Sequence, residues 1–116
     1  MSLMQVVLTL ACVAAIAVGQ VLFKLAARAG EASAAGFPWD ILNPWMAAAL
    51  VVYAATTLMW VWLLKAMPLN MAYPFVGLAF VIVPVLAAVF LGEALDWRHL
   101  AGGALIAAGV AVASWR

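Results

Sequence analysis

Four long runs of apolar residues alternate with short polar stretches along the chain. The runs are Leu3–Ala27, Trp45–Ala66, Leu69–Gly92 and about Arg98–Trp115. Each run is close to the roughly 17 to 25 residues that a helix needs to cross a bilayer. Between them lie a loop rich in Gly, Ser, Pro, Asn and Asp at residues 30–44, a proline at position 68, and the segment GEALDWR at residues 92–98. Because unpaired backbone groups are not tolerated in lipid, the pattern predicts an all-α bundle of four transmembrane helices.

The composition supports a single integral membrane domain over residues 1–116. Of the 116 residues, 72% are hydrophobic and only 8% are charged, whereas a soluble domain carries roughly 25% charged residues. A net charge of +1 without a basic cluster argues against nucleic acid as a partner. Cys12 is the single cysteine, which excludes a disulfide framework and a metal site built on cysteine spacing. We therefore expect no cofactor and no metal.

Tryptophan positions agree with four spans, because Trp prefers the headgroup level of a bilayer. The six tryptophans fall near predicted span ends: Trp39, Trp45 and Trp97 at one interface, and Trp60, Trp62 and Trp115 near the other. The few lysines and arginines are divided too evenly between the two sides to set the orientation of the chain.

The polar side chains of the first span share one face. Gln5, Thr9, Gln20 and Lys24 fall within an arc of about 100° on an α-helix, so this face is expected to turn away from lipid. Lys24 has two interpretations. Its amine extends to the membrane interface along an apolar stem, or, with Gln20, it binds an anionic phosphate group that enters from the membrane plane.

A second polar stripe is predicted in the second span, where Tyr53, Thr56, Thr57 and Trp60 recur at helical spacing. For the two threonines we expect hydrogen bonds between helices, which contribute on average only about 0.6 kcal/mol each in a membrane.

The third and fourth spans carry residues that alter helix geometry. Pro74, Gly77 and Pro84 lie within the third span, and an interior proline removes a backbone hydrogen bond and kinks a helix. We expect a hinge there, as in the broken helices of transporters. In the fourth span, Gly102 and Gly109 share one face and allow another helix to approach closely, either within the chain or between subunits.

None of the carboxylates lies in the middle of a predicted span; they are Glu31, Asp40, Glu93 and Asp96. The usual intramembrane proton carrier is therefore missing. Glu93 and Asp96 precede the fourth span, where acidic groups favour a helix N-terminus and Arg98 is available to pair with them. We expect His99 to be a helix-end residue rather than a proton relay.

Three motifs resemble a known family: GQVLFKLA in the first span, MPLNMAYPFVGLAFV opening the third, and LGEALDWRHLAGGALIAAGV through the fourth. They are similar to the four-helix members of the drug/metabolite transporter superfamily. Within it, they most resemble the small subunits of the flippase for aminoarabinose-phosphoundecaprenol, a lipid-linked sugar. The matching residues are Gly19, Gln20, Lys24, Pro68, Ala72, Tyr73 and Pro74.

The resemblance implies a multi-pass protein of the bacterial cytoplasmic membrane that translocates a polyprenyl-phosphate-linked sugar and performs no covalent chemistry. It implies that Gln20 and Lys24 receive the phosphate and sugar. Tyr73 is either a hydrogen-bond partner for them or a packing residue. Because four helices offer little room to enclose a headgroup, we expect a homodimer, or a heterodimer with a related small subunit, in contact through Gly102 and Gly109.

A more distant resemblance links the chain to the small multidrug resistance exporters, which exchange protons for organic cations through a glutamate in the first helix. In register with Gly19 and Lys24, that position is Ile16, and the tryptophan of their third helix falls at Val76. Both residues therefore depart from the exporter pattern. Two alternatives nevertheless stay open at the level of sequence, an exporter of small organic cations and a non-transporting accessory subunit of a membrane enzyme.

Overall fold

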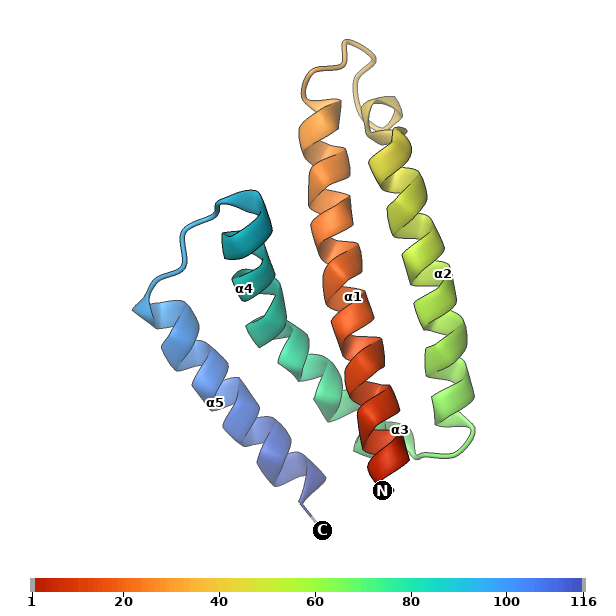
Figure 1. The fold of residues 1–116 in the computed structure, drawn as a ribbon, viewed down its shortest axis with the longest axis vertical. Helices are drawn as coiled ribbons and strands as arrows, with labels where there is room; N and C mark the ends of the chain where they lie inside the picture. Colours follow the sequence, from red (N-terminus) through yellow and green to blue (C-terminus); the bar gives the residue numbers. More distant parts are fainter. Residues whose placement is uncertain (1, 116) are drawn as a thin grey trace.

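The computed structural model describes residues 2–115, and this part of the chain is helical without strands (Figure 1). In chain order the elements are α1 (Leu3–Gly30), the 3-10 helix η1 (Trp39–Ile41), α2 (Pro44–Leu64), α3 (Leu69–Ala72), the 3-10 helix η2 (Tyr73–Leu78), α4 (Ala79–Leu91) and α5 (Trp97–Ser114). The all-α prediction is confirmed.

Three helical segments are long and apolar enough to cross a membrane. They are Leu3–Gly30, Pro44–Leu64 and Leu69–Leu91, the last of which joins α3, η2 and α4. The 18 residues of α5 begin with Trp97, Arg98 and His99, and these polar and interfacial side chains shorten its apolar part. The fourth crossing therefore remains a prediction.

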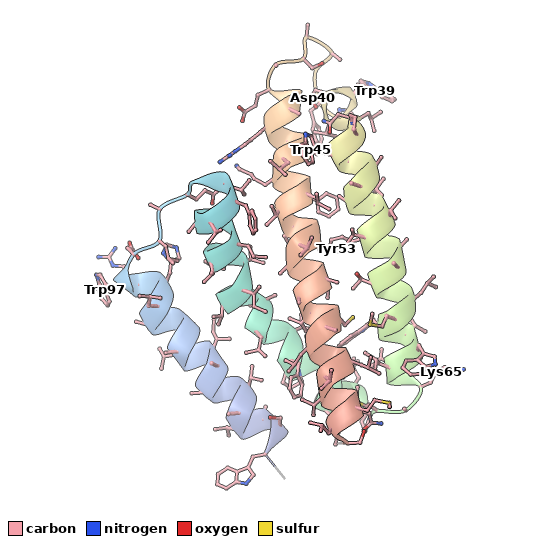
Figure 2. The ribbon with its side chains drawn as sticks, in the orientation of Figure 1. Trp39, Asp40, Trp45, Tyr53, Lys65 and Trp97 are labelled. Atoms are coloured by element: carbon pink, nitrogen blue, oxygen red, sulfur yellow. The ribbon has the colours of Figure 1, made fainter. Side chains whose placement is uncertain are left out.

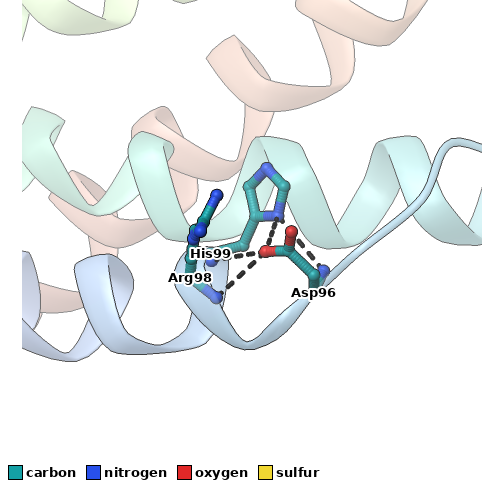
Figure 3. Close-up of polar contacts among 3 residues, drawn as sticks. All are labelled: Asp96, Arg98 and His99. Atoms are coloured by element: carbon teal, nitrogen blue, oxygen red, sulfur yellow. Dashed lines mark hydrogen bonds and ion pairs between the residues drawn. The ribbon is translucent and has the colours of Figure 1, made fainter.

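Local sequence signals account for where the helices begin and end. Ser2 caps α1 in a capping box with Gln5, and the Asn43 side chain accepts hydrogen bonds from the first backbone N–H groups of α2. Asp96 caps α5: its carboxylate accepts the backbone N–H groups of Arg98 and His99 at 2.9 and 3.3 Å (Figure 3). The Nδ1 atom of His99 accepts the backbone N–H of Asp96 at 3.2 Å, which agrees with a helix-end role for this histidine.

Tryptophans lie at the ends of helices, as a membrane protein requires. Trp39 and Trp45 lie beside the loop between α1 and α2, whereas Lys65 lies at the opposite end of α2 (Figure 2). Trp60 and Trp62 belong to the last turns of α2, and Trp97 is the first residue of α5. The helices therefore present two interfacial levels.

The helices are arranged in a flattened layer (Figure 1). α1 packs on α2 and α4, and α5 packs on η2 and α4 at one edge (Figure 1). The molecule measures 53 × 36 × 19 Å. Its accessible surface is 7392 Å², against about 6,100 Å² for a compact soluble protein of this mass. Apolar side chains cover much of that surface because lipid, not a protein interior, is their solvent.

Two small apolar clusters hold the layer together. One contains Cys12, Leu63, Met67 and Ala72, and the other contains Val13, Phe75 and Val110. Cys12 is fully buried, as expected of a small packing residue. The expected hydrogen bond between helices from Thr56 was wrong: its hydroxyl donates to the Val52 carbonyl of its own helix at 2.7 Å, because that i−4 acceptor is always within reach of a helical threonine.

The third apolar run changes helix type along its length. α3 gives way to the 3-10 segment η2, which contains Pro74 and Gly77, and then to α4, which continues through Pro84 without interruption. A short 3-10 stretch within a helix often marks a hinge. Whether these residues bend during function remains a prediction.

Candidate functional site

A groove runs along α1 and is made of three adjoining cavities of about 180, 400 and 250 Å³. The first two share Ile16 and Val76, and the last two share Gln20 and Val83. The part of α1 that lines the groove, from Ile16 to Lys24, is about 12 Å long at the rise of an α-helix. Neighbouring cavities thus share lining residues and form one elongated groove, the shape expected of a site for an extended ligand.

The cavity at one end of the groove is charged. It is lined by Gln20, Lys24 and Glu93, together with the apolar residues Val21, Val83, Ala87 and Leu91. Gln20 and Lys24 lie one helical turn apart on α1, as predicted, and both are exposed in the isolated chain. This end of the groove thus offers an amide, a cation and an anion to one ligand.

The position of Glu93 follows from the way α4 ends. Gly92 adopts the left-handed conformation with φ of 70°, and the backbone N–H of Glu93 donates to the Ala87 carbonyl at 3.2 Å, a C-terminal cap that favours glycine. From α1, the Arg28 guanidinium donates to the Leu91 carbonyl at 3.0 Å. These contacts fix the end of α4 against α1, beside Lys24.

The ion pair expected between Arg98 and the acidic residues was wrong. Glu93 faces Arg28 at 3.8 Å, with both side chains nearly half exposed. Within residues 2–115 no ion pair joins Arg98 to Glu93 or Asp96, and its guanidinium instead lies 5.7 Å from the centre of the Trp97 ring. The Arg28 side chain extends from α1 to the end of α4 and contacts Glu93 and Leu91 there, which sequence order alone does not indicate.

The middle of the groove is apolar. Ile16 and Val76 line it with Ala79, Phe80, Val83 and Pro84. Ile16 and Val76 are the positions where the resemblance to multidrug exporters places a glutamate and a tryptophan. Both residues line the centre of the groove, where the lining carries no titratable group.

Tyr53 belongs to α2 and lies between α2 and α1 (Figure 2), where it lines the smallest of the three cavities. The Gln20 amide nitrogen donates a hydrogen bond to its hydroxyl, and the Phe23 ring lies 5.0 Å from the Tyr53 ring, centre to centre. Gly19 leaves room for this ring: an added Cβ would lie 2.7 Å from its Cδ2 atom. The sequence places Tyr53 in a polar stripe but gives no sign that it contacts Gln20.

Tyr73 lies at the other end of the groove, away from Lys24. It lines the smallest cavity with Tyr53, Thr57 and Trp60, and it is 61% exposed. The structure therefore brings Gln20 and Lys24 into one cavity and places Tyr73 with Tyr53 in another.

The glycines of α5 lie outside this groove. Among residues 2–115, an added Cβ at Gly102 or Gly109 would meet no atom within 4 Å apart from the adjacent backbone of its own helix, whereas Gly103, on the packed face, lies against Val81. The described part of the chain therefore leaves Gly102 and Gly109 uncovered.

Comparison with known proteins finds relatives that match most of the chain. The chain is 37% identical over 110 residues to a protein of Pseudomonas aeruginosa (strain LESB58), covering 94% of this chain and 96% of the relative. It is 36% identical over 98 residues to proteins of Yersinia pestis (strain Pestoides F) and Yersinia pseudotuberculosis serotype O:1b (strain IP 31758), covering 84% of this chain and 85% of each relative. All three are named "Probable 4-amino-4-deoxy-L-arabinose-phosphoundecaprenol flippase subunit ArnE". No family model and no solved structure matches the chain.

Proposed function

This chain belongs to the family of ArnE flippase subunits, and we propose that it takes part in moving 4-amino-4-deoxy-L-arabinose-phosphoundecaprenol across the membrane. It is a multi-pass protein of the bacterial cytoplasmic membrane, in keeping with its three membrane-length helices. The observation that carries the proposal is the groove, which combines one charged end with an apolar middle. An amphiphile with a charged head and a hydrocarbon tail matches that division.

Lys24 binds the phosphate of the lipid in this proposal. Its amine is a cation in the same cavity as the Gln20 amide, and hydrogen bonds to charged groups contribute more than neutral ones. Among residues 2–115, Lys24 forms no ion pair, so its charge remains available to a ligand.

The alternative for Lys24 is that its amine extends to the interface. Arg28 lies one turn nearer the end of α1, where it already contacts Leu91 and Glu93. α1 continues to Gly30, six residues beyond Lys24, or about 9 Å at the rise of an α-helix. The depth of Lys24 below that helix end favours a contact inside the groove.

The remaining predicted features complete the proposal. Tyr73 meets the headgroup at the far end of the groove, after it has left Lys24. Bending at Pro74, Gly77 and Pro84 changes the width of the groove between these two ends. α5 crosses the membrane as a fourth span, with the third span kinked by proline. A second small subunit, identical or related, covers the groove by contact through Gly102 and Gly109.

Native mass spectrometry of the protein released from its own membranes in mild detergent tests this function. We expect a dimer that retains a sugar-bearing polyprenyl phosphate. In Lys24→Ala that adduct falls about tenfold, while the helical content measured by circular dichroism is unchanged. Lys65→Ala is the matched control, because Lys65 is a lysine just after the end of α2 and lines none of the three cavities.

Each other result points elsewhere. A retained adduct of undiminished intensity in Lys24→Ala assigns Lys24 to the interface and leaves the function standing. Binding of small organic cations without any lipid adduct favours an exporter, and co-purification with a larger membrane enzyme without lipid favours an accessory subunit. Either of these two results contradicts the proposed flippase function.

A further inference from the structure

Glu93 faces the proposed phosphate site across the charged cavity. It lines this cavity with Gln20 and Lys24, on the opposite wall, where α4 ends. The cavity therefore contains a positive and a negative side chain, whereas a phosphate would be bound by the positive one alone. The carboxylate of Glu93 either stabilises the loop after α4 through its ion pair with Arg28 or takes part in binding the ligand.

The contacts of Glu93 leave its carboxylate able to accept hydrogen bonds from a ligand. Its one ion pair, to Arg28, is 3.8 Å long, which exceeds a hydrogen bond, and the side chain is 44% exposed. Within residues 2–115 the carboxylate accepts no hydrogen bond. The Arg28 guanidinium meanwhile donates to the Leu91 carbonyl, so the end of α4 stays anchored to α1 without the help of Glu93.

We propose that Glu93 recognises the positively charged amine of the sugar and so selects amino sugars over neutral ones. This inference rests on the proposed function, because it takes the ligand from there. In a 4-amino-4-deoxy sugar linked to phosphate through carbon 1, the amine and the phosphate lie at opposite positions of the ring. Such a headgroup has one anionic and one cationic end, and Lys24 and Glu93 present the two complementary charges.

The test compares two synthetic lipids that differ only at carbon 4. Short-chain polyprenyl phosphate esters of 4-amino-4-deoxy-L-arabinose and of L-arabinose are titrated against the protein purified with its native partner, and bound lipid is measured by native mass spectrometry. The wild-type protein binds the amino ester about tenfold more tightly, as expected for a hydrogen bond between charged groups. Glu93→Gln binds the two esters equally, because the amide has no charge.

Two control variants separate recognition from bracing. Glu31→Gln removes a carboxylate at the end of α1 that lies outside the cavity, and it keeps the tenfold preference. Arg28→Gln breaks the ion pair with Glu93 but leaves the carboxylate in place, and it keeps the preference as well. If Arg28→Gln abolishes the preference as fully as Glu93→Gln does, Glu93 only braces the loop and the inference is wrong.

The same titration distinguishes this inference from the proposed function. Equal binding of both esters by the wild-type protein overturns the role of Glu93 and leaves lipid binding intact. The role of Glu93 is also overturned if Glu93→Gln still binds the amino ester more tightly than the arabinose ester. Failure of the wild-type protein to bind either ester removes the proposed function and the inference together.

Discussion

The amide nitrogen of Gln20 on α1 donates a hydrogen bond to the hydroxyl of Tyr53 on α2, in the wall of the groove. Gly19, one residue earlier, gives the Tyr53 ring its place against α1. Gln20 lines the charged cavity at one end of the groove, and Tyr53 lines the smallest cavity at the other end. Their hydrogen bond therefore connects the two ends of the groove across the interface between α1 and α2.

We expect Gln20 and Tyr53 to be energetically coupled. In a double-mutant cycle of Gln20→Ala and Tyr53→Phe, the coupling in the free energy of unfolding should be about 0.6 kcal/mol and at most about 1.7 kcal/mol, the range for polar contacts between membrane helices. Reversible unfolding in mixed micelles measures it. Additive effects of the two substitutions would show that the amide and the hydroxyl do not interact in the membrane.

Gly19→Ala should destabilise the protein by about 1 to 3 kcal/mol, the usual effect of forcing extra volume into a packed site. The new methyl group would overlap the Tyr53 ring, at 2.7 Å from Cδ2. Gly103→Ala is the matched control, because its added Cβ lies at an ordinary 3.4 Å from Val81 Cγ2 and gains helix propensity. If both variants unfold at the same denaturant concentration, the ring is free to move away from Gly19.

Pro84→Ala should slow lipid movement while it stabilises the fold. The substitution restores a backbone N–H inside α4, where it can bond to the Phe80 carbonyl, and an interior proline costs a helix about 3 kcal/mol. A stiffer α4 would open and close the groove less readily. Flipping of a labelled lipid in proteoliposomes, measured beside thermal stability, checks both effects. Unchanged flipping in a stabilised variant would mean that the proline shapes the helix without moving it.

Gly102→Leu and Gly109→Leu should each weaken the proposed dimer without loss of the folded chain. An added Cβ at either glycine meets nothing within the subunit beyond its own helix, so a larger side chain would obstruct a second subunit packed on this face. Ala111→Leu, at an exposed position on another side of α5, is the control and should leave the dimer intact. The ratio of monomer to dimer in native mass spectra reports the effect. Persistence of the wild-type ratio in both glycine variants would place the contact between subunits elsewhere.

Much of the fold follows from the sequence because periodicity and helix ends are local properties. The apolar runs locate the three long helical segments, and Asp96 caps α5 through contacts within three residues of itself. Gln20 and Lys24 share a cavity because helical spacing alone places them on one face. Helical spacing does not predict which face of α1 a neighbouring helix covers.

The parts that the sequence does not predict depend on contacts between distant segments. Glu93 pairs with Arg28, 65 positions away in the chain, because α4 packs on α1 and ends beside the Arg28 side chain. Tyr53 reaches Gln20 from a different helix. The pattern of apolar runs does not predict the flattened layer either. An apolar side chain is equally stable against lipid and against another helix, so its position in the sequence does not show which of the two it contacts.

The thinness of the layer, 19 Å in its shortest direction, has a consequence for how a long lipid is handled. A tunnel would have to admit the whole hydrocarbon tail end-first, whereas a groove about 12 Å long holds only the head and the first part of the tail. The rest of the tail then remains dissolved in the bilayer throughout the crossing. Substrates that share a head but differ greatly in tail length would therefore be handled at similar rates.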